Sequence, residues 1–199
     1  MNARILFGTA AVLALGAASP LRSAPKPSGS QQHEIDTRQS VMTIRVYKAG
    51  ALSAFGHNHE ITASIASGTV DTAARKTELH VQASALRVRD RDASEKDRGE
   101  IQSTMLGPQV LDSQRYPEIV FRSTSVEPAG AGAWQVHGSL TLHGQTRPVT
   151  VAVSEKDGRY AGSALLKQTD FGITPVRVAG GTIKVKDEIR IEFDVRLLR

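Results

Sequence analysis

The chain has 199 residues, of which 40% are hydrophobic and 23% are charged, and this fits one globular domain with an appendage. Its 25 Lys and Arg residues exceed its 20 Asp and Glu residues, so the formal net charge is +5. Basic residues alternate with acidic ones, as in Lys96-Asp97-Arg98, and form no phosphate-binding stripe, so nucleic-acid binding is not expected. The absence of cysteine excludes disulfides and a cysteine nucleophile.

Residues 1–24 have the pattern of a secretory signal peptide. A short positive start precedes the apolar run Ile5–Ala18, and Leu21-Arg-Ser-Ala24 offers a small-residue cleavage site. The run is shorter than the about 20 residues that span a bilayer. We therefore expect a flexible tether over 25–32 and a domain over 33–199, located in the periplasm or secreted, with no membrane-spanning segment in the mature chain.

Alternation of apolar and polar residues predicts strands through most of the remaining chain. The expected strands are 42–46, 57–65, 69–71, 76–85, 118–126, 134–142, 146–154, 160–166 and 188–198. Each has one apolar face, and about eight antiparallel strands of this kind can pair their edges by closing on themselves. The sequence therefore predicts an all-β protein, a single antiparallel eight-stranded barrel.

A short helical insert interrupts the strands. Ser94 followed by Asp97 resembles a capping box, and Gly107-Pro108 ends the segment. Few of its residues are large and apolar, so we expect a helix that lies on a rim and is exposed over most of its circumference. Both a connector and a lid over a barrel mouth fit this pattern.

One histidine cluster, Gly56-His57-Asn58-His59, is a candidate for chemistry. On a strand His57 and His59 project to the same side as Ile61. Two imidazoles could begin a zinc or iron site, which needs three or four ligands, but the other histidines are dispersed. A metal-dependent enzyme using His57 and His59 stays an alternative. The preferred interpretation makes both histidines hydrogen-bonded polar groups near one end of the interior.

No other motif in the sequence indicates an enzyme. The chain has no Gly-x-Ser-x-Gly elbow and no Gly-rich phosphate loop. An interior rich in small residues and poor in aromatics leaves room for one elongated ligand. We therefore predict a binding protein without catalytic residues, metal or cofactor. A non-catalytic interaction module of the cell envelope is kept as a further alternative.

Three segments, in this order, resemble a known family. They are Tyr116-Pro-Glu-Ile-Val-Phe-Arg-Ser-Thr124, Leu140-Thr-Leu-His-Gly-Gln-Thr-Arg-Pro-Val149 and Asp170-Phe-Gly-Ile173. They are similar to segments of the YceI-like family of bacterial secreted proteins, and the resemblance covers residues 33–199. It implies a lipocalin-like barrel, periplasmic or secreted, that holds a long isoprenoid chain, such as a polyprenyl phosphate or a quinone tail, in an apolar lumen.

Strand parity, combined with this resemblance, predicts which residues contact the lipid. They are Phe55, His57, His59, Ile61, Leu79, Met105, Leu111, Phe121, Leu140, Leu142, Phe171 and Phe193. Met105 and Leu111 are expected near a mouth, and His57 and His59 are expected to hydrogen-bond a headgroup. The expected partner is a long-chain isoprenoid lipid or quinone, and a homodimer is left open.

Overall fold

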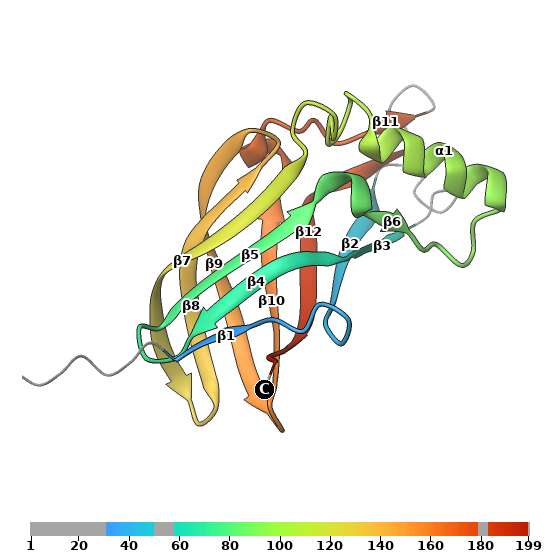
Figure 1. The fold of residues 1–199 in the computed structure, drawn as a ribbon. Helices are drawn as coiled ribbons and strands as arrows, with labels where there is room; N and C mark the ends of the chain where they lie inside the picture. The colour runs from blue at the N-terminus through green and yellow to red at the C-terminus, as the bar shows by residue number, and fades with distance from the viewer. Residues whose placement is uncertain (1–30, 50–57, 179–182, 199) are drawn as a thin grey trace, which may run out of the picture.

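A computed structural model describes residues 31–49, 58–178 and 183–198 as a curled antiparallel sheet with one α-helix at one end (Figure 1). The strands are β1 (Gln32–Glu34), β2 (Val41–Ala49), β3 (His59–Ala63), β4 (Ile65–Asp71), β5 (Lys76–Gln82), β6 (Arg87–Val88), β7 (Glu118–Gly130), β8 (Ala133–Leu142), β9 (Gln145–Lys156), β10 (Arg159–Lys167), β11 (Arg177–Val178) and β12 (Ile183–Arg196). The helices are α1 (Glu95–Leu106) and the short 3₁₀ turns η2 (Ala83–Ala85) and η3 (Gln168–Phe171).

The sheet curls because β3 and β4, which are consecutive in the chain, lie near opposite ends of the strand order. Strand order is β1-β4-β5-β7-β8-β9-β10-β12-β2-β3-β6, and β11 pairs with β12 beside this path. Only Ser64 separates β3 from β4, yet β3 pairs with β2 while β4 pairs with β5. The segment after β1 adds a second tie, because the amide of Ile35 donates to the Gly68 carbonyl and that of Asp36 to the Arg196 carbonyl. The sheet thus encloses an interior.

The predicted all-β antiparallel fold with a helical insert is confirmed, but the predicted count of eight strands is not, since the described residues form a curled sheet of twelve strands. Strands β6 and β11 have two residues each, and β1 has three. Such short strands leave no readable alternation in the sequence. The break at Ser64 also falls inside a single predicted strand.

The helix begins and ends where the sequence predicts. The Ser94 hydroxyl accepts a hydrogen bond of 3.1 Å from the Asp97 amide, and Gly107 follows the last turn. Met105 is the buried residue of α1. Within the described residues, no helix is long and apolar enough to cross a membrane.

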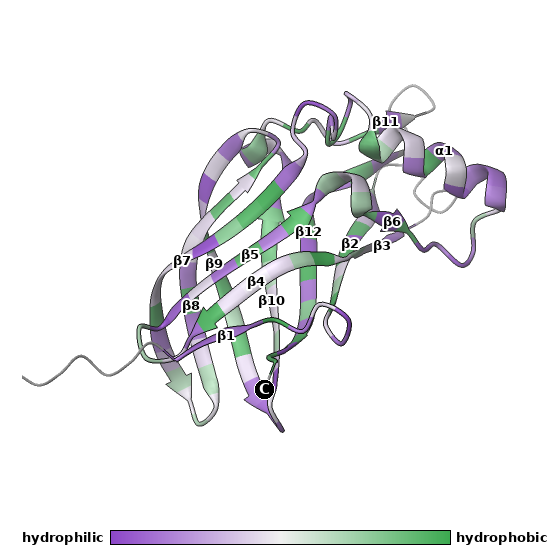
Figure 2. Ribbon diagram, in the orientation of Figure 1, coloured by the Kyte–Doolittle hydropathy of each residue, from purple (hydrophilic) through white to green (hydrophobic). Residues whose placement is uncertain are grey.

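Apolar side chains on the inner face of the sheet form the main core. Figure 2 shows apolar and polar residues alternating along the strands, as expected for a sheet with one dry face. The buried members of this core include Ile44, Ile61, Val81, Leu86, Leu140, Leu142, Leu166, Phe171 and Ile173. A smaller cluster around Ile35, Ile65 and Val195 packs beside it.

Candidate ligand-binding cavity

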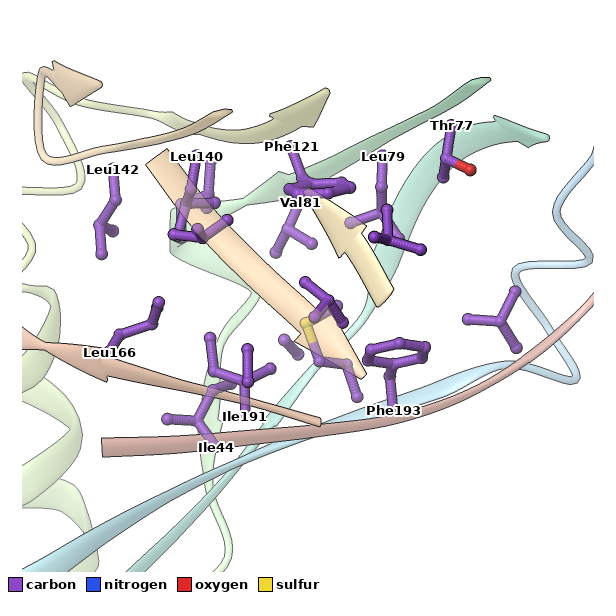
Figure 3. A pocket seen from close by; sticks show the side chains of 18 of the residues that line it. Ile44, Thr77, Leu79, Val81, Phe121, Leu140, Leu142, Leu166, Ile191 and Phe193 are labelled. Carbon is purple, nitrogen blue, oxygen red and sulfur yellow. The ribbon is translucent and has the colours of Figure 1, made fainter. Parts of the chain in front are cut away.

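An apolar cavity of about 390 Å³ lies inside the curled sheet (Figure 3). Each long strand contributes alternate residues to its wall, such as Leu79 and Val81 from β5 and Leu140 and Leu142 from β8. The volume falls within the range of small-molecule sites, about 300–1,000 Å³. The wall is dominated by aliphatic side chains, so the cavity favours an apolar ligand.

Most residues predicted to contact the lipid do line this cavity. They are Ile61, Leu79, Met105, Leu111, Phe121, Leu140, Leu142, Phe171 and Phe193. Phe55 and His57 lie outside the described residues. His59 lies in a separate polar cleft. Lipid contact by any of these residues stays a prediction.

The sequence reasoning missed several lining residues, although some carried a signal. Met42, Ile44 and Val46 line the cavity from β2, and their shared face was readable from strand parity. Ala164 and Tyr160 also line it, from β10. A small residue or a half-polar ring does not stand out in a hydrophobic pattern, so these two could not be distinguished from surface residues.

One end of the cavity is closed by the segments around η3 and α1. Phe171 is 1% exposed, and Ile173, Met105 and Leu111 are also buried there. Met105 and Leu111 were expected near a mouth, but the structure places them at this closed end. We call it the plug end.

The three segments that carry the family resemblance meet at the plug end. In the turn between β8 and β9, the His143 Nδ1 lies 3.1 Å from the Phe171 carbonyl oxygen, and the Arg147 Nε donates to the Asp170 carbonyl at 2.9 Å. The Tyr116 ring packs edge-on against the His143 ring, with centroids 4.7 Å apart. These contacts anchor the backbone of η3, so the motif residues fix the plug in place.

The opposite end of the cavity opens at the turn between β4 and β5. Thr72 and Arg75 of this turn and Lys76 at the start of β5 line the cavity and are exposed, whereas Phe171 and Ile173 at the plug end are buried. Trp134 and Tyr160 line the cavity as well, with ring centroids 6.4 Å apart. We call this end the mouth.

Two basic residues, Arg75 and Lys76, line the mouth. Arg75 has φ 53°, a left-handed conformation that is uncommon for a long side chain. Neither Arg75 nor Lys76 forms an ion pair or a side-chain hydrogen bond with another residue that the structure describes. Nearby, the Asp71 carboxylate accepts a hydrogen bond from the Ala74 amide. The mouth therefore carries a small excess of positive charge.

His59 lies in a polar cleft outside the apolar cavity. Its Nδ1 is 2.6 Å from the Asp90 carboxylate, whose other oxygen accepts a hydrogen bond from the Glu60 amide at 2.7 Å. The Asp90 side chain is 2% exposed, so it anchors the segment before α1 to β3. In the described residues His59 is thus a partnered polar group, away from the mouth.

Arg45, in the same cleft, bridges two carboxylates. It donates to Glu192 at 2.9 Å and to Glu60 at 2.8 Å. The hydrogen bond from Arg45 lowers the pKa of Glu192, and the hydrogen bonds to Glu192 and Glu60 raise the pKa of Arg45. All three side chains are more than one-third exposed, so these ion pairs contribute little to stability.

No group of three or more His, Cys, Asp and Glu residues in the described ranges could hold a metal ion. The metal alternative also depends on His57, which lies outside those ranges.

A curled antiparallel sheet around an apolar cavity that opens at one end is the architecture of a lipocalin-like binding protein. The chain belongs to the YceI-like family, because the model of the YceI-like domain matches residues 33–197. The family membership predicted from the sequence is therefore confirmed.

Two curated proteins are similar to this chain in sequence, and one solved structure is similar to it in fold. A UPF0312 protein of Vibrio cholerae is 27% identical over 194 residues, covering 91% of this chain and 96% of that protein. A UPF0312 protein of Pseudomonas syringae is 37% identical over 73 residues, covering 32% of this chain and 38% of that protein. The crystal structure of Burkholderia cenocepacia BcnA matches with a TM-score of 0.58 at 18% identity, covering 81% of this chain and 98% of BcnA. At that identity the likeness establishes the fold.

Proposed function

We propose that this protein binds a long-chain isoprenoid lipid, of polyprenyl or quinone type, and carries or sequesters it in the cell envelope. The observation that carries the proposal is the apolar cavity of about 390 Å³, whose walls hold predominantly aliphatic side chains from nine strands of the sheet. Each methylene-sized group that leaves water contributes about 0.8 kcal/mol, so a few isoprene units give useful affinity. The protein is proposed to act without catalysis, metal or cofactor, in the periplasm or outside the cell.

The polarity of the two ends orients the proposed ligand. Phe171 and Ile173 make the plug end largely apolar, with Lys167 and Gln168 as the polar lining residues there, whereas Thr72, Arg75 and Lys76 offer donors at the mouth. The tail would therefore lie toward the plug and the headgroup at the mouth. This differs from the expected headgroup contact by His59, which lies in the polar cleft.

The test of this function is native mass spectrometry of the protein purified from a bacterial host, followed by solvent extraction. We expect a bound mass that is lost on extraction and identified as a polyprenyl or quinone lipid. A protein that carries no lipid, and that also fails to bind added polyprenol and quinone, would contradict the proposal. The same spectrum reports whether the protein is a homodimer.

Two alternatives predict different results in the same preparation. A metal-dependent enzyme requires stoichiometric metal by elemental analysis, lost in the His57→Ala, His59→Ala double variant. An envelope interaction module requires another envelope protein to co-purify, with an empty cavity.

The basic residues of the mouth give a prediction about the headgroup. In the Arg75→Gln, Lys76→Gln double variant we expect binding of a polyprenyl phosphate to weaken by about five-fold, because exposed charges contribute modestly. Binding of the uncharged polyprenol should not change. Tryptophan fluorescence titration at low salt measures both, since Trp134 is the single tryptophan and lines the cavity near the mouth. High salt should reduce the difference.

Lys96→Gln is the matched control for this variant. The Lys96 side chain is 84% exposed on α1, at the plug end of the sheet, so Lys96→Gln removes one positive charge away from the mouth, compared with two in the double variant. Lys167→Gln tests the reverse orientation, because Lys167 lines the cavity near the plug. Weaker binding of the phosphate in Lys167→Gln, with none in the double variant, would show that the headgroup lies at the plug end instead.

A further inference from the structure

Two phenylalanine rings line the cavity from opposite walls (Figure 3). Phe121 belongs to β7 and Phe193 to β12, which are separated in the curled sheet by β8, β9 and β10. Figure 3 shows both rings nearly edge-on, one on each side of the interior, so their faces are turned toward the space between them. The other aromatic lining residues lie at the two ends: Phe171 at the plug, and Trp134 and Tyr160 toward the mouth.

Each of these two rings is held flat by a glycine on a neighbouring strand. A Cβ atom at Gly138 would lie 2.5 Å from the Phe121 Cε2, and a Cβ atom at Gly162 would lie 2.5 Å from the Phe193 Cζ. Such distances are impossible for real side chains, so glycine is what lets each ring lie over the backbone of the adjacent strand. We call the spaces left by Gly138 and Gly162 the two notches. Without them the rings would be pushed into the cavity.

The pairing register explains why the rings reach these glycines. Gly162 is directly opposite Phe193, and Gly138 lies diagonally across from Phe121, whose direct partner is Leu140. Diagonal neighbours lie within reach of an aromatic side chain. The two notches thus arise independently, in different strand pairs, and produce the same arrangement on both walls.

We propose that Phe121 and Phe193 form an aromatic clamp that selects chains with flat, unsaturated groups over saturated chains of equal length. This inference rests on the proposed lipid binding and specifies the chemistry of the chain. A trisubstituted double bond and its substituents lie in one plane, so two ring faces can cover both sides of it at once. A saturated branched chain is puckered and cannot present two flat faces. Aromatic rings gain from such face contacts beyond the area they bury.

The competing role for these rings is structural. An aromatic side chain that covers a glycine on the neighbouring strand stabilises the strand pair by itself. Both Phe121 and Phe193 are half-buried, so loss of either ring would lower stability whatever the ligand. A ratio of affinities for two ligands separates the roles, because a change in stability alone affects both ligands equally.

The experiment compares geranylgeraniol with its fully hydrogenated analogue in the wild-type protein and in Phe121→Leu, Phe193→Leu and the double variant. We expect the wild-type protein to prefer geranylgeraniol by about five-fold, and the double variant to bind both lipids with a ratio near one. Leucine keeps the site apolar and removes the ring. Substitution at either glycine is avoided, since a Cβ there would also press on a backbone carbonyl oxygen.

Leu165→Met is the control, because Leu165 is exposed and is not among the residues that line the cavity, so this variant should keep the wild-type ratio. Equal ratios in the wild-type protein and the double variant would overturn the clamp, and so would a wild-type ratio of one. A wild-type protein that binds neither lipid, nor a quinone, would count against the proposed function instead.

Discussion

Replacing Ala164 with phenylalanine is expected to abolish lipid binding while the fold persists. Ala164 lines the cavity from β10, and its strand partner is Ile191, which also lines the cavity. The added ring would occupy the space of about four methylene-sized groups of the ligand. At about 0.8 kcal/mol each this removes about 3 kcal/mol, which is more than a hundred-fold in affinity.

Ala161→Phe is the matched control for this prediction. Ala161 lies on the same strand, is exposed and faces away from the cavity, so the same enlargement should leave affinity unchanged. Isothermal titration with a polyprenol measures both variants, and thermal unfolding of each checks that it is folded. If folded Ala164→Phe protein binds as tightly as Ala161→Phe protein, the ligand does not occupy this cavity.

The cavity wall was predictable because strand side chains alternate with a strict period of two. Leu140 and Leu142 were assigned to the interior from this rule, as were Leu79 and Phe121, and the structure places all four on the wall. The rule needs only local sequence. It works wherever the strand is long and has one dry face.

The position of the mouth was not predictable in the same way. Which end of the cavity opens depends on how η3 and α1 pack across one end of the sheet, far from the strands in sequence. Met105 was correctly assigned to the interior, yet it closes the end that it was expected to border. Arg75 and Lys76 carried no signal, because two basic residues in a turn are ordinary surface residues in any sequence.

His59 illustrates a second limit of pattern reasoning. Parity places its side chain with that of Ile61, but the partner that fixes it is Asp90, 31 residues later. Asp90 lies in the connection between β6 and α1, and its approach to β3 depends on tertiary packing. A contact between residues so far apart in sequence produces no periodic pattern. The sequence therefore could not show whether His59 lines the cavity or the neighbouring polar cleft.

The family resemblance was informative about the fold for a physical reason. Tyr116, His143, Arg147 and Asp170 belong to the segments that carried it, and they join one another at the plug end. They secure the closed end of the sheet through backbone carbonyls and ring packing. Residues with this role specify the architecture, whereas the residues of the proposed clamp and of the mouth lie largely outside those contacts.

Phe171→Ala is expected to destabilise the protein by about 3–5 kcal/mol, the range for truncating a buried aromatic side chain. Among the residues that the structure describes, Phe171 is the largest fully buried side chain, 1% exposed, and it packs in the main core at the plug end. The hydrogen bonds from Arg147 and His143 involve the carbonyl oxygens of Asp170 and Phe171 itself, so they remain available in the variant. The loss therefore reports the burial of the ring.

Urea unfolding followed by Trp134 fluorescence measures this loss, with Leu165→Ala as the control. Leu165 is 58% exposed, so its truncation should change the free energy of unfolding by less than about 0.5 kcal/mol. Equal unfolding free energies for the two variants would contradict the assignment of Phe171 as the plug.

Because the truncation also opens space at the closed end, we expect Phe171→Ala to gain affinity for longer chains relative to short ones. That shift connects the plug to the ligand, since a residue that only stabilised the fold would leave chain-length preference unchanged.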